Sequence, residues 1–177
     1  MEAKGIDVSY FQGYINWQQV SQNQIEFAMV RATYGTTGTD RMFARNMDEI
    51  KKTDIHPGVY HYCYAMNTAE AVREAQHFIN TIKSYELHYP AALDLEEASI
   101  AELGKEAVTD IIIAFVDTLK SANYYPILYV DVDWIRNYID MNRIPDLDIW
   151  LSDWGPEMQY SGNVTIWQYS SDGNVPG

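Results

Sequence analysis

Hydrophobic and polar positions along the chain follow two alternating periods. Short apolar or alternating runs of four to eight residues are typical of strands, whereas apolar residues spaced three and four apart indicate one face of a helix. Seven strands are predicted, at residues 4–9, 27–33, 58–64, 90–97, 126–130, 147–151 and 164–169. Between most of them the helical period returns, so the chain predicts a regular alternation of strands and helices.

The helical segments have recognisable faces and start signals. Helices are predicted over residues 15–22, 42–52, about 67–82, about 108–119 and 134–139. Asn67 with Glu70 three residues later supplies a start signal for the third of these, and Asn16 can cap the first. Ser99 and Glu102 have the spacing of a capping box, which predicts a helical turn before the fourth.

Strands that alternate with helices imply parallel βαβ units, and two architectures fit seven of them. One is an irregular (β/α) barrel of the TIM type that is one strand short, and the other is an open doubly wound sheet. Acidic residues fall near the carboxyl ends of the first and fourth strands, where barrel enzymes assemble their sites. A glycine-rich phosphate turn after the first strand, which the open sheet would favour, is not present. We therefore predict the barrel, as a single catalytic domain over residues 1–177.

The stretch Pro90–Glu97 contains the candidate chemistry. Side chains two apart in a strand share a face, so Asp94 and Glu96 are expected to project together while Leu93 and Leu95 pack on the other side. Two like charges held this close raise the pKa of one of them. A protonated acid beside an ionised one is the pair that hydrolyses glycosidic bonds. The simpler alternative is a strand end that meets water.

Composition and charge narrow the range of possible binding partners and cofactors. The formal net charge of −13 argues against nucleic acid or an anionic membrane surface as the main partner. No apolar run approaches the roughly 20 residues of a membrane span, and no signal peptide is recognised at the N-terminus. Cys63 is the single cysteine, so no internal disulfide is expected. We expect no metal and no cofactor, and calcium at the loop aspartates stays an alternative even though they lack the spacing of an EF-hand loop.

Five groups of short motifs, in order along the chain, carry a family resemblance. They are Asp7-Val8-Ser9 with Gln12-Gly13 and Ile15-x-Trp17; Arg31-Ala32-Thr33-x-Gly35; Gly58-x-Tyr60-His61-Tyr62; Ala92-Leu93-Asp94-Leu95-Glu96; and Trp167-Gln168-Tyr169-Ser170 before Gly173. Together they resemble the lysozymes of glycoside hydrolase family 25. The resemblance implies a β/α barrel that cleaves the β-1,4 bond between N-acetylmuramic acid and N-acetylglucosamine in bacterial peptidoglycan.

The resemblance also assigns roles to three acids. It implies that Glu96 is the general acid, that Asp94 is its partner, and that Asp7 is a third carboxylate on the floor of the cleft. Neighbouring Asp7 and Asp94 would raise the pKa of Glu96 and keep it protonated. The family is often described as using the substrate's own N-acetyl oxygen as the nucleophile, with the first acid of Asp-x-Glu orienting that amide. A mechanism with two carboxylates and no such assistance stays open.

Aromatic residues are the second candidate element, because sugar rings stack on Tyr and Trp. We predict substrate contacts from Tyr62, Tyr129 and Trp150, followed by Tyr34 and Gln168. Tyr60 shares the strand parity of Tyr62 and is included with them. For each aromatic residue, packing in the core is the competing interpretation.

Three functional hypotheses follow. The first is a peptidoglycan hydrolase that acts on the cell wall, extracellularly or after release by lysis, as the catalytic module of a lysin with a wall-binding domain outside this chain. The second is a catalytically silent glycan-binding barrel, and a chitin-directed glycosidase is a third. Family members usually continue past the segment matching Val175-Pro176-Gly177 into a final strand with one more Asp, so the expectation is a barrel whose last strand is missing.

Overall fold

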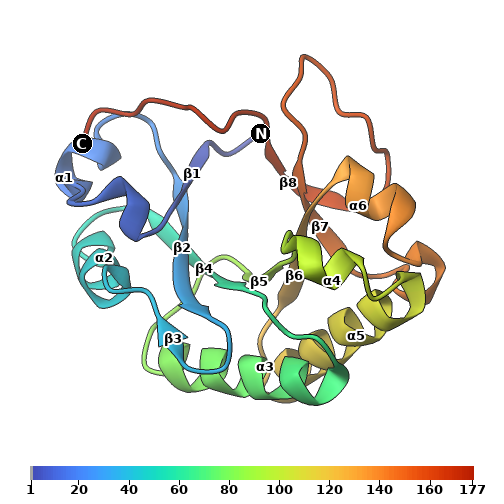
Figure 1. The fold of residues 1–177 in the computed structure, drawn as a ribbon. Helices are drawn as coiled ribbons and strands as arrows, with labels where there is room; N and C mark the ends of the chain where they lie inside the picture. The colour runs from blue at the N-terminus through green and yellow to red at the C-terminus, as the bar shows by residue number, and fades with distance from the viewer. Residues whose placement is uncertain (1) are drawn as a thin grey trace.

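The computed structural model describes residues 2–177, which form a curled sheet with helices on its outer side (Figure 1). The strands are β1 (Gly5–Val8), β2 (Phe27–Tyr34), β3 (Gly38–Thr39), β4 (His56–Tyr62), β5 (Ala91–Asp94), β6 (Pro126–Asp131), β7 (Asp148–Ser152) and β8 (Val164–Gln168). The helices are α1 (Trp17–Ser21), α2 (Phe43–Ile50), α3 (Thr68–Ile82), α4 (Ala98–Ala101), α5 (Lys105–Ser121) and α6 (Val132–Asn137). All seven predicted strands are present, and β3 is a two-residue addition.

The strand order shows which architecture the chain adopts. The strands follow one another as β1-β2-β4-β5-β6-β7-β8, each pair being parallel, and β3 pairs antiparallel with β2. A doubly wound sheet would reverse its order at a switch point, and this order never reverses. The predicted irregular, incomplete TIM-like barrel is therefore confirmed, and the open doubly wound sheet is excluded.

The barrel has a seam between β1 and β8. These two strands are the ends of the sheet, and within residues 2–177 no ladder of hydrogen bonds joins them. The segment after β8 crosses from β8 toward α1 as coil, without forming a strand (Figure 1). There the Asn16 N–H donates to the Gly177 carbonyl at 3.0 Å.

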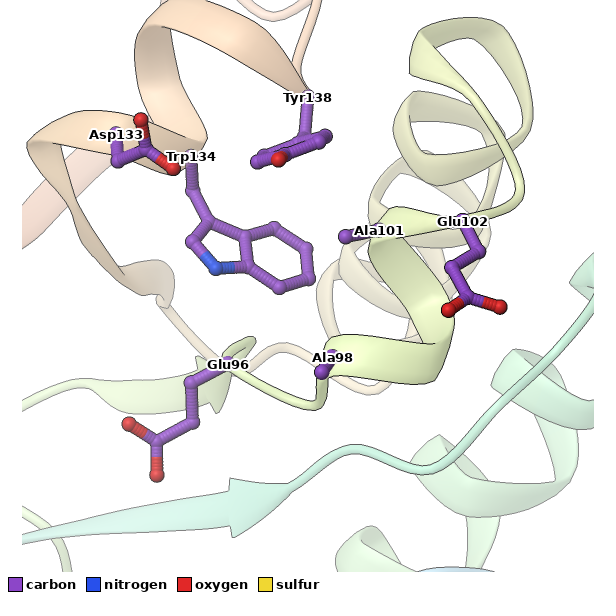
Figure 2. Close-up of a pocket in the computed structure, with 7 residues that line it drawn as sticks. All are labelled: Glu96, Ala98, Ala101, Glu102, Asp133, Trp134 and Tyr138. Carbon is purple, nitrogen blue, oxygen red and sulfur yellow. The ribbon is translucent and has the colours of Figure 1, made fainter.

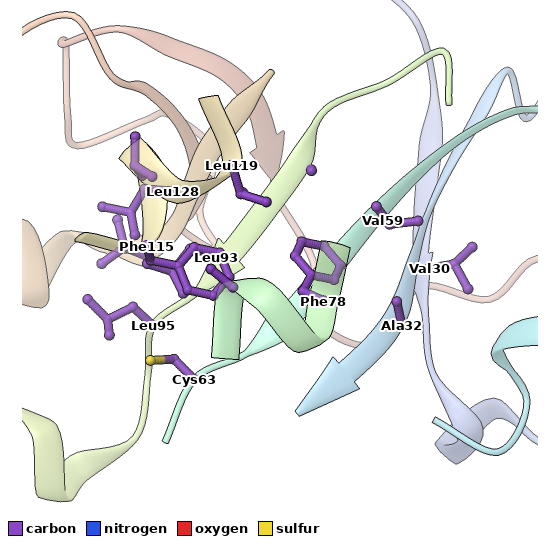
Figure 3. Close-up of a cluster of buried hydrophobic side chains, with 14 of the residues drawn as sticks. Val30, Ala32, Val59, Cys63, Phe78, Leu93, Leu95, Phe115, Leu119 and Leu128 are labelled. Atoms are coloured by element: carbon purple, nitrogen blue, oxygen red, sulfur yellow. The ribbon is translucent and has the colours of Figure 1, made fainter. Parts of the chain in front are cut away.

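Two hydrophobic clusters lie on the two faces of the sheet. The larger one fills the space between the sheet and the helices, where Phe78 of α3 and Phe115 of α5 meet Leu93 and Leu95, all fully buried (Figure 3). The smaller one lies inside the curl and consists of Phe27, Met29, Ala92, Ile127 and Trp150. Burial on both faces explains why the central strands read as almost continuously apolar.

The inner face changes character toward the carboxyl ends of the strands. Four neighbouring strands each place an apolar residue inside and, two positions later on the same face, a polar one. These pairs are Ala92 and Asp94, Ile127 and Tyr129, Trp150 and Ser152, and Ile166 and Gln168. The apolar residues therefore fill the interior as a packed plug, and the polar groups lie above this plug, toward the carboxyl ends of the strands.

One predicted capping signal is wrong. The Asn67 side chain does cap α3, accepting a hydrogen bond from the Glu70 N–H at 2.9 Å. Ser99 and Glu102, however, do not form a capping box, because Ser99 already lies inside α4 and the residue before that helix, Glu97, makes no capping bond. The longer α5 begins only after Gly104, whose φ of 86° is a conformation that favours glycine.

Candidate active site

The acids predicted from the sequence come from two strands and gather above the inner plug. Asp7 lies in β1, Asp94 is the last residue of β5, and Glu96 follows two positions later. The Leu95 N–H still donates to the Tyr129 carbonyl at 3.1 Å, so the extended pairing continues past β5. Leu93 and Leu95 are consequently buried on the outer face while Asp94 and Glu96 share the inner one.

Asp94 is the most unusual of these carboxylates. Its residue is 5% exposed, and its Oδ1 atom has no hydrogen-bond partner among the residues that the structure describes. Burial raises the pKa of Asp94 well above its ordinary value, and the negative charges of Glu96 and Asp7 raise it further. Arg31 opposes this shift without reversing it. A buried acceptor with no donor is a position that a ligand N–H or O–H can fill.

Glu96 is exposed to solvent. The protein around it still removes part of its hydration, and this desolvation is the largest cause of its raised pKa. The charges of Asp131, Asp7 and Glu97 contribute in the same direction. Because Asp7 raises the pKa of both Asp94 and Glu96, the three groups share one electrostatic field.

Gln168 fixes the position of Asp7 across the seam. Its Nε2 donates to Asp7 Oδ2 at 3.1 Å. Its Oε1 accepts from Tyr129 Oη at 3.0 Å, Ser152 Oγ at 3.2 Å and Trp154 Nε1 at 3.1 Å. Burial raises the pKa of Asp7, and the bond from Gln168 partly offsets that rise. Gln168, which was predicted as a substrate contact, is in this structure an internal link between β8 and β1.

The predicted aromatic contacts divide into accessible and buried rings. Tyr34 is 39% exposed at the end of β2, and half-buried Tyr62 donates from its hydroxyl to Glu97 Oε2 at 3.3 Å. Tyr60 and Tyr129 pack edge-on against Trp150, with ring centroids 5.8 and 4.6 Å from it. Trp150 was predicted to stack on a sugar. It is only 3% exposed, so little of its ring surface is free for such a contact. Packing within the inner apolar cluster, with Phe27, Met29, Ala92 and Ile127, explains its position better.

A hollow that the sequence reasoning missed adjoins Glu96. It has a volume of about 380 Å³ and lies between α4 and α6 (Figure 2). Its lining consists of Glu96, Ala98, Ala101, Glu102, Asp133, Trp134 and Tyr138. Trp134 is 7% exposed, and its backbone N–H donates to Asp131 Oδ1 at 2.8 Å. We call this space the α4/α6 hollow.

Two other conspicuous residues have structural partners. His61 is fully buried and lies 2.7 Å from both Thr33 Oγ1 and Glu74 Oε2, as a hydrogen-bonded residue behind the sheet. Arg31 pairs through Nε with Asp40 Oδ2 at 2.9 Å. Because both side chains bond to other residues of the protein, we interpret them as structural residues around the three acids.

Metal binding and membrane crossing depend on the side chains and helices of residues 2–177. No group of three or more His, Cys, Asp or Glu side chains in that range is arranged to hold a metal ion. None of its helices combines the length and the apolar character that crossing a membrane requires.

A curled parallel sheet with carboxylates grouped at the carboxyl ends of its strands is the arrangement of a barrel glycoside hydrolase. A family model, "Glycosyl hydrolases family 25", matches residues 6–177, and the chain belongs to that family.

Individual relatives agree with this assignment. The chain is 27% identical over 177 residues to the autolytic lysozyme of Clostridium acetobutylicum, covering 98% of this chain and 52% of that protein. A family 25 glycosyl hydrolase from Bacillus anthracis superposes with a TM-score of 0.85 at 26% identity, covering 99% of this chain and 82% of the other. The modular autolysin LytC from Streptococcus pneumoniae, solved with a synthetic peptidoglycan ligand, superposes with a TM-score of 0.86 at 25% identity, covering 98% and 44%. The chain thus spans about half the length of that curated lysozyme.

Proposed function

We propose that this glycoside hydrolase cleaves bacterial cell-wall peptidoglycan at the β-1,4 bond that follows N-acetylmuramic acid. Membership of family 25, the lysozyme among its relatives and the relative solved with a peptidoglycan ligand support this substrate. On this proposal residues 1–177 act as one catalytic unit at the wall, and a wall-binding module lies outside them. The catalytically silent glycan-binding barrel is the second candidate, and the grouping of three acids favours the enzyme over it.

The unpartnered oxygen of Asp94 is the observation that carries the mechanism. The pKa of each of the three carboxylates is raised, and Asp7 raises those of Asp94 and Glu96, so the group holds protons to a higher pH than three isolated carboxylates would. An acetamido N–H that donates to Asp94 Oδ1 would stabilise the Asp94 anion and lower its pKa. The retained proton then remains on Glu96, next to the bond to be cleaved. Substrate binding itself therefore sets the protonation state that the reaction needs.

The steps follow from these positions. Glu96 donates its proton to the bridging oxygen, and the leaving sugar departs with that oxygen as a hydroxyl. The acetamido oxygen of the muramyl residue, held by Asp94 through the amide N–H, attacks the anomeric carbon and forms a cyclic oxazolinium intermediate. Asp94 and Asp7 stabilise the positive charge that develops. Water then opens the ring while Glu96 takes up the water proton, and two inversions leave the anomeric configuration retained.

The Glu96→Gln substitution tests this assignment. Removing the proton donor should lower the lytic rate on purified peptidoglycan by about 10²–10⁴-fold, since general acid catalysis contributes about that factor. The far-UV spectrum and melting temperature should stay unchanged, because Glu96 is exposed. Unchanged activity in this variant would refute the role of Glu96, and an inactive parent protein that still binds peptidoglycan would favour the glycan-binding alternative.

The stereochemistry tests the rest of the mechanism. Proton NMR of the first reducing ends released should show the β-anomer before mutarotation. An initial α-anomer would mean a single inversion and would exclude the oxazolinium route. Substrate whose muramyl amino group lacks the acetyl group should be hydrolysed at least about 100-fold more slowly, because the nucleophile is then absent.

A further inference from the structure

We infer that a pocket at the amino-terminal end of the barrel is a second glycan-binding site, which holds an uncharged stretch of a polysaccharide strand away from the three acids. Its volume of about 420 Å³ is within the range of small-molecule sites, about 300–1,000 Å³. Its polar and aromatic lining consists of Tyr85, His88, Tyr89, Asn123, Tyr124 and Tyr125, and we call it the tyrosine pocket. Only the choice of peptidoglycan as the polymer rests on the proposed function.

The tyrosine pocket lies between two loops at the end of the sheet opposite to the acids. Residues 83–90 lead from α3 into β5, and residues 122–125 lead from α5 into β6. Both loops are therefore at the amino ends of their strands, whereas Asp94 is at the carboxyl end of β5. The inner plug, which includes Ala92 and Ile127, lies between the two ends. A sugar in this pocket is consequently separate from the bond that is cleaved.

Hydrogen bonds and packing fix both loops before any ligand binds. The Tyr89 N–H donates to the Pro57 carbonyl at 3.0 Å, and the Ala91 N–H donates to the Tyr125 carbonyl at 3.0 Å, which joins one loop to the other. The Tyr89 ring stacks on Phe27 of the inner cluster, with centroids 4.4 Å apart and planes 7° apart. A preformed site loses less conformational freedom when it binds a ligand.

Tyr125 offers an oriented ring surface in the tyrosine pocket. It is 63% exposed, so packing within the protein covers little of it. Its hydroxyl nevertheless donates to Asp148 Oδ2, and this bond restricts where the ring can point. A tyrosine ring that is both exposed and held in place is a surface on which the apolar C–H face of a pyranose packs.

The rest of the lining suits an uncharged, polar ring. Four of the 14 tyrosines of the chain line this one pocket. Tyrosine hydroxyls, the imidazole of His88 and the amide of Asn123 donate and accept hydrogen bonds, as sugar hydroxyl and acetamido groups require. Among the described residues, the lining includes no Lys or Arg, and the chain has a formal net charge of −13. An anionic polymer would find no counter-charge here, so an N-acetylated neutral sugar is the better match.

A second site changes how the barrel meets an insoluble wall. The wall presents many strands of the same repeating glycan, so a barrel that holds one strand in the tyrosine pocket keeps its acids close to others. Two linked binding events raise the overall affinity without any new contact at the acids. The pocket should therefore matter for insoluble peptidoglycan and not for a short soluble fragment, which cannot reach both sites.

Amide chemical shifts test where a glycan binds. The probe is the soluble β-1,4-linked tetramer of N-acetylglucosamine, added to the Glu96→Gln protein so that hydrolysis does not interfere. The amides of residues 85–91 and 123–125 should shift as the probe is added, and a further Tyr125→Ala substitution should abolish these shifts. Unshifted amides in both loops at millimolar probe would overturn the site. Shifts there with an anionic phosphate-containing wall polymer but not with the tetramer would overturn the choice of a neutral sugar.

Sedimentation with insoluble peptidoglycan measures the contribution of the ring. In the Glu96→Gln background, Tyr125→Ala should weaken retention about fivefold, since one aromatic contact contributes about that factor. Tyr125→Phe keeps the ring and should stay within about twofold. With Glu96 intact, Tyr125→Ala should slow lysis of the wall by a similar factor and leave hydrolysis of a soluble tetrasaccharide fragment unchanged.

Controls separate this pocket from folding and from the proposed function. Tyr14→Ala removes an 80% exposed ring from the loop before α1 and should change neither retention nor lysis. Equal losses on wall and soluble fragment with Tyr125→Ala, or no loss on either, would overturn the second site. A parent protein that hydrolyses neither substrate but shows the loop shifts would refute the proposed function and support the tyrosine pocket.

Discussion

Two buried aspartates in this barrel have opposite surroundings. Asp40, in the loop after β3, is 3% exposed and is fully engaged. Its Oδ2 accepts from Arg31 Nε at 2.9 Å and from the Tyr10 N–H at 3.0 Å, and its Oδ1 accepts from the Met42 N–H at 2.9 Å. Asp94 is 5% exposed and has one oxygen with no partner among the described residues.

The difference separates a structural acid from a reactive one. Burying a carboxylate is unfavourable unless donors and a counter-charge compensate it, and Asp40 has both. At Asp94 the compensation is incomplete, so its burial destabilises the empty protein. Such a position is maintained when the missing partner comes from a ligand. The two residues therefore predict opposite phenotypes for the same chemical change, Asp to Asn.

The largest effect is expected on catalysis at Asp94. Asp94→Asn should lower the lytic rate by about 10²–10³-fold, because a neutral amide no longer stabilises the positive charge of the intermediate. Its melting temperature should be equal to or above that of the parent, since a buried charge has been removed. Turbidity assays and calorimetry on the same sample measure both. Activity within threefold of the parent would remove Asp94 from the mechanism.

Asp40→Asn should show the reverse pattern. Loss of one partner of a buried ion pair leaves Arg31 uncompensated, so the free energy of unfolding should fall by about 3 kcal/mol. Activity per folded molecule should stay close to that of the parent at a temperature where the variant is folded. Urea titration gives the stability, and the lytic assay gives the activity. A stable but inactive Asp40→Asn protein would place this aspartate in the site and abolish the contrast.

The smallest effect concerns the pH dependence of stability. The pKa of Asp94 is raised on folding, so between its unfolded value of about 3.9 and its folded value the native state binds more protons. Its contribution to stability is thus fully present below about pH 4 and is lost as pH rises through the folded pKa. Relative to the parent, Asp94→Asn should gain about 1.4 kcal/mol for each unit by which that pKa is raised.

The measurement is a urea titration of both proteins at pH 4 and at pH 8. The stability difference between them should be close to zero at the lower pH and favour the variant at the higher one. The titration of His61, whose pKa burial lowers, affects both proteins and cancels in the difference. A difference that does not change with pH would mean that Asp94 is not the source of the pKa shift.

The fold and the three acids were accessible from the sequence for definite physical reasons. Strand and helix periods are local signals, so all seven principal strands and the main helices follow from residue spacing. The parity of Asp94 and Glu96 is also local, and it predicts their common face. Asp7 is more distant in the chain, and only the rule that parallel strands end at one face, together with the family resemblance, brings it to the other two.

Other parts of the site depend on contacts that spacing does not encode. Trp134 is an ordinary stripe residue of α6 in the sequence, and only the packing of α4 beside it creates the hollow. Gln168 was predicted as a substrate contact, but its bond to Asp7 requires β8 to lie across the seam from β1. Glu74 had a readable signal, since a charged residue on the apolar face of α3 needs a buried partner, and His61 provides it.

The seam has a consequence for how the protein fluctuates. Among residues 2–177, β1 and β8 each have a single strand neighbour, so no ladder partner in that range protects their outer amides. Deuterium should enter these two strands before it enters β4 and β5, which are paired on both sides. Asp7 lies in β1 beside the seam, and the side-chain amide of Gln168 links it to β8. The seam of the barrel is therefore also a wall of the site, and an opening motion there would move Asp7 relative to Asp94 and Glu96.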